Sequence, residues 1–483
     1  MDYTKLGFKC GLEVHQQLDT AKLFCACVSV LRSDEPDLIV ERKLHPVAGE
    51  SGEVDVAAKH EAEKNLDFFY QYYKDSNCLV ELDEEPPHEI NSDALGIALQ
   101  VALLLNCRIF PITQIMRKTV IDGSNTSGFQ RTVLIAHGGY VETASGKVGI
   151  ETIGLEEDAA RIVSNEKGKK IYRLDRLGIP LVEISTSPDI KTPEQAKEVA
   201  LYIGNVLRSC RVKRGLGTIR QDVNVSIKGG ARTEIKGMQD MKIFVKAIEN
   251  EIERQSNLIE NKKEVVEGVR NVLPDATTEF LRPIPGAARM YPETDLMLLR
   301  ISRDRINEVK KNLPQLRTDI AEELKREGLD SEMIGILLKE NRVDEFRSLL
   351  EVLNNPKVVA KSLLIYSKEI AKKFAGSVED TERISELLNS SLDFILGAVA
   401  KKKISEAQIK SAMERIAEGK SFEDAIVFEK EDEGIVEEKI LKIINEKPGL
   451  NANAYMGLVM KEFKGKIDGK KAMEIIKKYV GQN

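Results

Sequence analysis

The spacing of apolar and polar residues divides the chain into two parts of different character. Up to about residue 295, short alternating or apolar runs are separated by Gly, Pro and turn dipeptides, a pattern typical of strands. The clearest of these runs are residues 8–18, 131–135 and 218–228. Helical spacing occurs at 93–105 and at 192–208, where Thr192 and Pro193 form a helix start. The pattern predicts a sheet-rich domain with helices packed on it.

From about Asp304 onward, helical spacing takes over and turn residues become rare. The lysine run 401–403 marks a further break, so residues 301–400 are predicted to form a helical domain and residues 401–483 a small helical tail. Residues 246–272 show one long, charged and unusually polar helical pattern with little turn chemistry, which predicts a single long helix.

Length and composition limit the class of protein. At 483 residues the chain is long enough for about three domains, and 42% hydrophobic with 31% charged residues is typical of a globular protein. The net charge of −6 means that contact with a polyanion has to come from local clusters. No run of about 18 apolar residues and no basic-then-apolar N-terminus is present, so we expect no membrane segment and a cytoplasmic protein.

Six cysteines are scattered along the chain, and only Cys25 and Cys27 are close together. No disulfide framework can be recognised, which favours a reducing compartment. The Cys25-Ala-Cys27 pair is half of a zinc-binding motif without its partner pair. We therefore do not predict a structural zinc site.

The first candidate for chemistry lies on the predicted strand 8–18. All five histidines precede residue 138, so any imidazole must come from the N-terminal part. With a period of two, four apolar side chains of this strand share one face, and Glu13, His15 and Gln17 share the other. A carboxylate and an imidazole two residues apart form half of a divalent-metal site. The alternative is a solvated strand face with a partly buried His, and this segment alone does not decide between them.

A second candidate is the acidic run Glu156-Glu157-Asp158 at the end of a predicted strand. Three consecutive carboxylates repel one another unless cations compensate them. Acidic triplets are usually solvated loops. The apolar residues that lead into this one instead favour a buried strand end, the sort of place where Mg²⁺ is bound.

The third candidate is the strand 218–228, where Arg220, Asp222 and Asn224 alternate with apolar residues. This set suits a nucleotide phosphate with its metal, because Arg neutralises charge while Asp and Asn hold Mg²⁺ and its waters. The alternative is an ordinary half-exposed strand. The chain has no Walker or dinucleotide fingerprint and no amidase signature, so a hydrolysed nitrogen donor would require another protein chain.

Basic residues collect near the C-terminus. Solvated helix faces often have this composition, but dispersed lysines also meet RNA phosphates without reading the sequence. The lysines that we take as the candidate tRNA contact are Lys461, Lys464, Lys466, Lys470 and Lys471.

Taken together, several segments resemble the B/E family of tRNA-dependent amidotransferase subunits over nearly the whole chain. The segments that carry the resemblance include Gly-Leu-Glu-Val-His-Gln-Gln-Leu-Asp-Thr (11–20), Leu-Glu-Glu-Asp-Ala (155–159), Pro-Leu-Val-Glu-Ile (180–184), Arg-Gln-Asp-Val-Asn-Val-Ser (220–226) and Gly-Lys-Ile-Asp-Gly-Lys-Lys (465–471). The segment Ser-Gly-Phe-Gln-Arg (127–131) is similar to the archaeal E branch rather than the bacterial B branch.

The resemblance implies an α+β fold in three parts. These are a glutamine-synthetase-like antiparallel sheet cradle at 1–300, which is the catalytic domain, an all-helical domain at 301–400, and a YqeY-like tail at 401–483 that binds tRNA. Members of the archaeal E branch usually carry an inserted domain resembling part of bacterial aspartyl-tRNA synthetases. This chain has no room for it and lacks it near 258–268, whether by natural loss or by design.

The resemblance also implies a reaction and its residues. ATP phosphorylates the side-chain carboxylate of glutamate on tRNA(Gln), and ammonia from an asparaginase-like D subunit, in a heterotetramer, displaces the phosphate. The expected catalytic residues are Glu13, His15, Glu156 and Glu157, with Glu13, His15 and Glu157 as Mg²⁺ ligands and Arg220, Asp222 and Asn224 on the ATP side. Two rival functions are a ligase for a small free carboxylate and a non-catalytic tRNA scaffold. The acceptance of aspartyl-tRNA(Asn) stays open.

Overall fold

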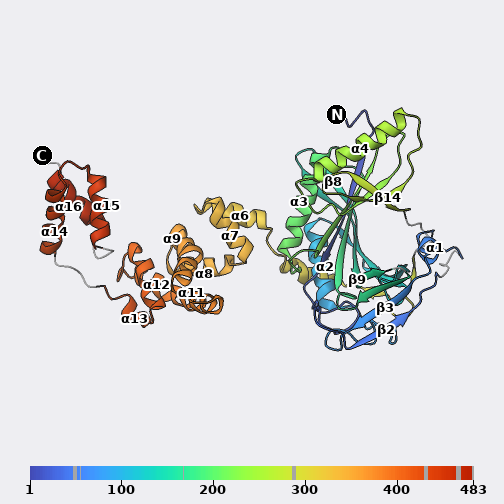
Figure 1. Cartoon of the computed structure of the whole chain (residues 1–483), viewed down its shortest axis with the longest axis horizontal. Coiled ribbons are helices and arrows are strands. Elements are labelled where there is room, and N and C mark those ends of the chain that lie inside the picture. The colour runs from blue at the N-terminus through green and yellow to red at the C-terminus, as the bar shows by residue number, and fades with distance from the viewer. Residues whose placement is uncertain are drawn as a thin grey trace. The chain divides into compact units, whose positions relative to one another are not determined.

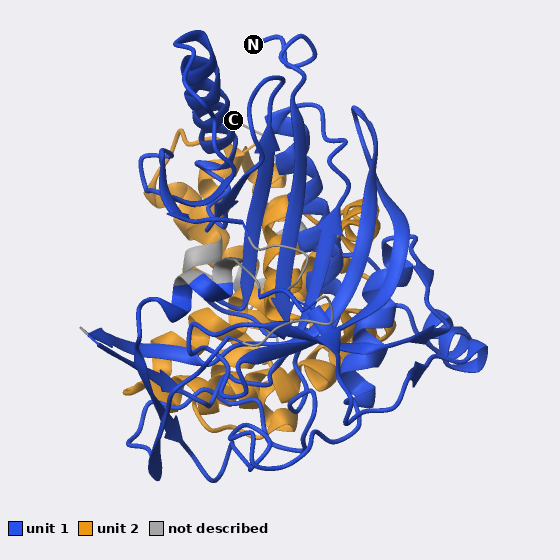
Figure 2. Cartoon of the chain, turned by 90° about the vertical axis from the view of Figure 1, so that its right-hand side faces the viewer, with its two compact units in different colours: residues 1–317 blue, residues 318–483 orange. Residues whose placement is uncertain are grey.

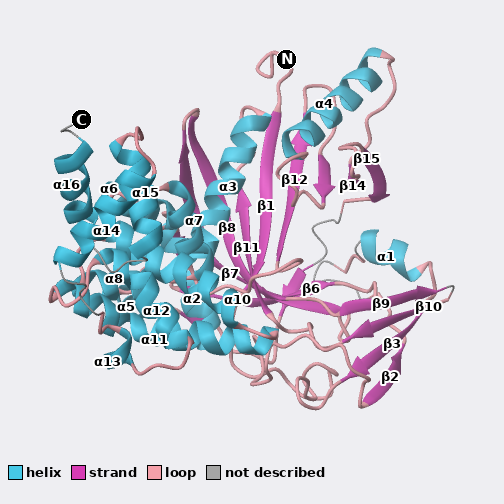
Figure 3. Cartoon of the chain, turned by 60° about the vertical axis from the view of Figure 1, so that its left-hand side comes forward, coloured by secondary structure: helices cyan, strands magenta, loops and turns pink. Residues whose placement is uncertain are grey.

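In a computed structural model, the chain forms two compact units, residues 1–317 and 318–483 (Figure 2). The structure describes residues 1–46, 52–54, 56–166, 168–284, 290–428, 433–463 and 469–480, without the side chains of 56, 57, 60, 433–436, 460, 461, 463 and 469–471. The first unit combines sheets with helices. In the second unit, the described residues form helices and connecting loops only (Figure 3). The α+β class expected from the sequence is confirmed.

The main sheet of the first unit has eleven strands, in the order β15-β14-β13-β12-β1-β11-β8-β7-β6-β16 with β4 beside β7. Its strands are β1 (Lys9–Gln17), β4 (Arg108–Ile109), β6 (Ile115–Thr119), β7 (Phe129–Thr143), β8 (Gly146–Glu157), β11 (Pro180–Thr186), β12 (Ile219–Ser226), β13 (Thr233–Lys236), β14 (Gly268–Val272), β15 (Thr278–Arg282) and β16 (Met290–Pro292).

The described residues of the first unit also form two smaller sheets. A four-stranded sheet has the order β2-β3-β10-β9, and β17 pairs with β5. Their strands are β2 (Leu38–Arg42), β3 (Asp67–Tyr72), β5 (Ile112–Thr113), β9 (Arg161–Glu166), β10 (Lys169–Arg173) and β17 (Leu299–Arg300). Figures 1 and 3 show the four-stranded sheet at the end of the long strands away from α4.

Strand β1 lies inside the main sheet, and its alternating sequence gives it one mostly apolar face. Cys10, Leu12 and Val14 are buried in the main core, as the period of two predicted. Antiparallel pairing places β12 on one side of β1 and β11 on the other. The opposite face of β1 therefore lies between the polar faces of two neighbouring strands.

Helices cover the apolar face of the main sheet. They are α2 (Ser92–Leu104), α3 (Pro193–Ser209) and α4 (Phe244–Glu260), joined in this unit by α1 (Val56–Ala62) and α5 (Arg303–Lys311) (Figure 1). The side chain of Asn91 caps α2, and Thr192 Oγ accepts the N–H of Gln195 at the start of α3. Both helices expected from the sequence are confirmed.

The predicted single helix over 246–272 is wrong. Helix α4 ends at Glu260, Lys262 takes a left-handed backbone conformation (φ 54°), and the chain continues as β14. The pattern was misleading because one narrow stripe of α4 is buried and because Lys262 gives no turn signal. Since α4 crosses over between β13 and β14, these strands run parallel, and the main sheet is mixed rather than wholly antiparallel.

The second unit is built from helices around two separate apolar clusters. Its elements are α6 (Arg317–Arg326), α7 (Ser331–Glu340), α8 (Val343–Val352), α9 (Pro356–Lys361), a π-helical turn (Ser362–Tyr366), α10 (Ser367–Phe374), α11 (Val378–Ala400), a 3₁₀ turn (Glu406–Gln408), α12 (Ile409–Ala417), α13 (Phe422–Ala425), α14 (Glu433–Glu446), α15 (Ala452–Phe463) and α16 (Gly469–Val480). One cluster extends from Leu324 to Ala425 and the other from Ile440 to Ile476. The apolar packing therefore continues past the boundary expected at residue 401.

Candidate functional site

The polar face of β1 forms the centre of a cluster of ionisable side chains. One ligand atom each of Glu13, His15 and Glu183 lies within 4.8 Å of the others. The register explains the meeting, because His15 faces Glu183 across the β1–β11 pair. Carboxylate oxygens together with one imidazole nitrogen can hold a divalent cation. The structure therefore brings Glu13 and His15 together as expected, and it adds Glu183, which the sequence did not single out.

Glu156 joins this cluster from β8. Its Oε1 lies 3.5 Å from His15 Nε2, and its Oε2 accepts a hydrogen bond from Lys118 Nζ at 2.8 Å. Lys118 Nζ also lies 3.6 Å from a carboxylate oxygen of Glu183. The lysine on β6 thus holds two acids of the cluster in place while it compensates part of their charge.

The β12 side of the cluster carries a second lysine. Asp222 faces Glu13 across the β1–β12 pair, and its carboxylate accepts a hydrogen bond from Lys236 Nζ at 2.6 Å. The same ammonium group lies 2.7 Å from Glu234. Two lysines therefore face five carboxylates, and the surplus of negative charge favours a cation.

The pKa of Glu13 reflects this surplus of negative charge. Burial, followed by the charges of Glu183 and Glu234, raises the pKa of Glu13 to about 8, against a smaller opposing effect of Lys236. Burial also lowers the pKa of His15 and keeps the imidazole neutral, which is the form that binds metal. A divalent cation bound here would displace the proton of Glu13 and relieve the repulsion. The residues present fit a cation such as Mg²⁺.

Glu157 does not join the cluster. Successive residues of a strand point to opposite faces, so Glu157 lies on the other side of β8 from Glu156. There its carboxylate accepts the backbone N–H of Arg131 at 3.2 Å and lies 3.5 Å from the guanidinium of Arg131. Arg131 in turn donates to the buried carboxylate of Glu293 at 2.8 Å. The structure thus gives Glu157 a place in a buried ion-pair network, where we had expected a metal ligand.

Asp158 completes the acidic run and links it to β12. Its carboxylate accepts hydrogen bonds from Arg220 at 2.8 Å and from the side-chain amide of Gln17 at 2.6 Å. All three acids of the run are buried, as expected for a strand end. Each has a cation beside it: Lys118, Arg131 or Arg220. The repulsion that a bare triplet would suffer is therefore compensated within the fold.

The residues expected to bind ATP lie in a row on β12. Arg220 faces His15, Asp222 faces Glu13, and Asn224 faces Gly11. The Oδ1 atom of Asn224 is buried without a hydrogen-bond partner, which is costly unless a ligand or water supplies a donor. The row therefore stands beside the cation cluster and carries an acceptor atom available to a bound molecule.

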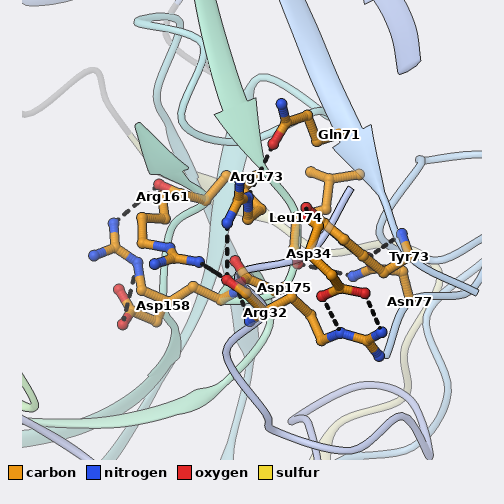
Figure 4. Close-up of polar contacts among 12 residues, drawn as sticks. Arg32, Asp34, Gln71, Tyr73, Asn77, Asp158, Arg161, Arg173, Leu174 and Asp175 are labelled. Carbon is orange, nitrogen blue, oxygen red and sulfur yellow. Dashed lines mark hydrogen bonds and ion pairs between the residues drawn. The ribbon is translucent and has the colours of Figure 1, made fainter. Parts of the chain in front are cut away.

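A rigid polar network supports this edge of the site (Figure 4). The buried carboxylate of Asp175 accepts the backbone N–H of Arg32 at 2.7 Å and the guanidinium of Arg161 at 2.6 Å. Arg173 donates to Gln71 at 2.9 Å and to the carbonyl oxygen of Arg32 at 2.8 Å. Because the bonds tie the loops of Arg32 and Asp175 to β3, β9 and β10, the network fixes the backbone that follows Asp158.

The partner pair that Cys25-Ala-Cys27 lacks in the sequence is present in space. Ligand atoms of Cys25, Cys27, Cys78 and Glu81 lie within 4.8 Å of one another. Thiol hydrogen bonds from Cys25 and Cys78 lower the pKa of Cys27 to about 4. Three thiols and a carboxylate are a donor set that suits tetrahedral zinc, so the reason for expecting no structural zinc does not hold. The sequence signal was weak because the second half of the motif ends in Glu, some fifty residues later.

The C-terminal lysines cannot be placed in this way. Lys464 and Lys466 lie outside the described residues, and so do the side chains of Lys461, Lys470 and Lys471. Their role in RNA binding stays a prediction. In the described part of the chain, no helix is both long enough and apolar enough to cross a membrane.

In the comparison with known proteins, the family match covers most of the first unit. A family model described as the GatB/GatE catalytic domain matches residues 8–307. A protein of Methanocaldococcus jannaschii, named as the E subunit of glutamyl-tRNA(Gln) amidotransferase, is 36% identical, with 99% of both chains covered. Proteins of the same name from Methanothermobacter thermautotrophicus and Sulfurisphaera tokodaii are each 35% identical, with 92% and 100% of this chain covered and 94% and 100% of theirs.

One alignment also bears on the missing insert. The alignment with the Methanocaldococcus protein has 633 positions, whereas this chain has 483 residues. At least 150 positions of that alignment are therefore gaps in this chain. The relative is longer although its ends match, which is consistent with an internal domain that this chain lacks.

Proposed function

The chain belongs to the GatB/GatE family, and from that premise we propose that it converts glutamyl-tRNA(Gln) to glutaminyl-tRNA(Gln) in an ATP-dependent transamidation. It phosphorylates the side-chain carboxylate of the tRNA-bound glutamate and then replaces the phosphate by ammonia. The observation that carries this proposal is the carboxylate–imidazole cluster of Glu13, His15 and Glu183 beside the polar row of β12. A scaffold that only binds RNA would have no use for a buried surplus of acid.

Phosphate is needed because a carboxylate is a poor electrophile. ATP, when bound, supplies the phosphoryl group that turns one carboxylate oxygen into a leaving group, and Mg²⁺ neutralises charge on the phosphates. In this proposal, Glu13, His15 and Glu183 hold the cation, and Glu156 lies beside them, 3.5 Å from His15 Nε2. This set differs from the expected one in a single member, since Glu183 takes the place of Glu157.

The β12 row provides the nucleotide side. We assign Arg220 to the phosphates because its guanidinium is partly exposed and, among the described residues, forms its ion pair with Asp158 alone. Asp222 and Asn224 orient the cation and its waters, and the buried Oδ1 of Asn224 accepts a donor from the bound nucleotide or from water. Lys118 and Lys236 keep the surrounding acids in position and stabilise charge that develops during transfer.

Ammonia requires a second protein in this scheme. The chain has no amidase signature, so we propose that an asparaginase-like D subunit supplies the ammonia, in a cytoplasmic heterotetramer. The relatives are named as one subunit of an amidotransferase, which supports an enzyme made of several different chains. Ammonia from solution should replace the partner in a test of the chemistry.

The proposed function is tested by a transamidation assay. The full chain is incubated with glutamyl-tRNA(Gln), ATP, Mg²⁺ and ammonium, with and without an asparaginase-like partner. We expect glutaminyl-tRNA(Gln) that depends on both ATP and Mg²⁺. Glutamine formed from free glutamate without tRNA would instead identify a small-carboxylate ligase, and absence of any product would favour a scaffold. Aspartyl-tRNA(Asn) in a parallel reaction defines the substrate range.

The C-terminal tail offers a second test, of RNA binding. The apolar cluster from Ile440 to Ile476 is separate from the preceding one, so a chain ending at Phe428 keeps the larger cluster intact. Because this truncation removes several lysines that we assign to tRNA phosphates, we expect weaker tRNA binding and a shallower salt dependence in the shortened chain. Filter binding at several salt concentrations measures both. Unchanged affinity and slope would exclude the tail from tRNA recognition.

A further inference from the structure

Away from the carboxylate cluster, the end of α3 carries a group of three arginines. Arg208 lies in the last turn of α3, Arg214 lies in the loop 211–218, and Arg317 ends the first unit. The backbone N–H of Arg317 donates to Ser209 Oγ at 3.1 Å, which fixes Arg317 beside the end of the helix. Two cationic residues of one short stretch, Arg208 and Arg214, thus meet a third, Arg317, that lies about a hundred residues later in the sequence.

These arginines differ from the neighbouring Arg211, which has an acidic partner. Arg211 is paired with Asp93, whereas no acidic side chain of the described residues forms an ion pair with Arg208, Arg214 or Arg317. Burial and then the charge of Arg214 lower the pKa of Arg208, and the pKa of Arg317 is lowered by burial, Arg214 and Arg208. The mutual repulsion costs free energy. An anion bound between the guanidiniums would remove that cost.

The loop that carries Arg214 projects from the surface. Gly215 and Gly217 have φ angles of 125° and 80°, in the left-handed region that favours glycine, and nothing lies within 4 Å of the position of an added Cβ. Leu216 between them is fully exposed. Thr218 Oγ1 donates to the carbonyl oxygen of Gly215 at 2.8 Å and closes the loop. The projecting loop therefore presents Arg214 and the side chain of Leu216 to solvent, where a bound molecule could reach both.

The position of this loop indicates the kind of anion. It leads directly into β12, where Arg220 stands opposite His15 of the carboxylate cluster. A polymer held at the loop would therefore have an end beside the proposed reaction site. Guanidinium groups bind phosphates through paired hydrogen bonds, and several phosphates spaced along one chain suit several arginines.

We propose that the arginine loop, defined as Arg208, residues 211–218 and Arg317, binds backbone phosphates of the tRNA close to its aminoacylated 3′ end. Leu216 packs against an exposed ribose or base there, as apolar side chains do in other complexes with nucleic acids. This inference rests on the proposed function, because it needs a substrate that is attached to RNA. It adds a positioning surface within the first unit, independent of the C-terminal tail.

The test compares tRNA binding by the full chain and by the triple variant R208Q/R214Q/R317Q. Each lost phosphate contact reduces the slope of log K against log salt, so the slope should fall by about two to three. At about 0.15 M salt we expect roughly tenfold weaker binding. In transamidation with ammonium, KM for the charged tRNA should rise while kcat stays within about twofold, because the surface binds RNA outside the reacting atoms.

The control variant is K74Q/K147Q/K169Q. It removes the same total charge from the first unit, but each of these lysines is exposed and paired with an acid: Asp37, Glu142 and Glu166 in turn. We expect its affinity and salt slope to stay close to those of the unchanged chain. A second variant, L216D, places a negative charge on a fully exposed side chain, so it should weaken tRNA binding without affecting the fold.

The outcomes separate the two proposals. If the unchanged chain transamidates and binds tRNA, but the triple variant and L216D bind with the same affinity and slope, the inference about the arginine loop is overturned while the proposed function stands. Normal tRNA binding together with loss of assembly with a partner protein would overturn it as well, since the surface would then bind protein. A chain that neither binds tRNA nor transamidates would overturn both.

Discussion

Replacing Glu13 by Gln should reduce ATP-dependent formation of glutaminyl-tRNA(Gln) by about 100-fold or more. Glu13 is one of three groups whose ligand atoms lie within 4.8 Å, and Gln keeps its shape while removing the charge that a divalent cation needs. Removing a charge-stabilising group from a reaction centre has effects of this order. The measurement is single-turnover transamidation with ammonium, with Mg²⁺ varied. An E13Q chain as active as the original at the same Mg²⁺ concentration would remove Glu13 from the site.

The E13Q substitution should also change the stability of the folded chain, and the pKa of Glu13 predicts the direction of that change at each pH. Because the folded pKa of Glu13 is raised to about 8 from an ordinary value of 4.5, the folded state binds more protons than the unfolded state between these pH values. Without metal, the stability contributed by the protonated carboxyl is present below pH 4.5 and is lost as the pH rises toward 8. The E13Q chain should lack this loss and be the more stable one at pH 8. Urea unfolding in metal-free buffer at several pH values measures the difference.

A matched control is Glu142→Gln. Glu142 lies on β7 of the same sheet, but it is exposed and pairs only with the exposed Lys147 among the described residues. The substitution changes the net charge of the chain equally. We expect transamidation, Mg²⁺ dependence and the pH dependence of stability all to stay as in the original chain.

Replacing Arg131 by Met should lower the free energy of unfolding by about 3–5 kcal/mol, because it leaves the buried carboxylate of Glu157 without its cation and leaves Glu293 with Arg117 alone. The guanidinium of Arg131 lies between Glu157 and Glu293, at 3.5 and 2.8 Å, and its side chain is almost fully buried. It also stacks over the ring of Phe129, 5.1 Å from the centroid. Methionine keeps much of the apolar contact and removes the charge, so the loss measures the buried network. Urea unfolding at pH 7 provides the value.

Two further variants isolate the cause. In R131M/E157Q the stranded charge of Glu157 is also removed, while Glu293 keeps its pair with Arg117, and we expect a large part of the lost stability to return. Arg211→Met breaks the exposed pair with Asp93 and should change stability by less than about 1 kcal/mol. A loss in R131M no larger than in R211M would mean that water reaches the carboxylates and that the network is not a buried one.

The Glu156-Glu157 pair shows where inference from the sequence reached its limit. Alternation along a strand predicts that the two side chains point to opposite faces. It does not predict which of these faces carries the cluster. That choice depends on which strands lie beside β8. Lys118 comes from β6 and Arg131 from β7, and only the order and register of these strands beside β8 decide which acid each one meets.

The metal-binding candidates show the same limit. Glu183 stands in an ordinary alternating strand, and nothing near it in sequence connects it to His15, yet antiparallel register places the two residues opposite each other. Cys78 and Glu81 likewise complete the Cys25–Cys27 pair only because two loops meet in space. Long-range pairing of this kind leaves no local signal in one sequence.

By itself, the sequence determined the local elements whose cause is local: the apolar face of β1, the capped starts of α2 and α3, the buried end of β8 and the family to which the chain belongs. These follow from periodicity, capping and short motifs, which act within a few residues. Only the tertiary structure decided which acids surround His15, that Glu157 belongs to an ion-pair network, and that three unpaired arginines meet at the end of α3 in the described part of the chain. Those facts depend on strand order and register, and the free energy that fixes them comes from burying the sheet as a whole.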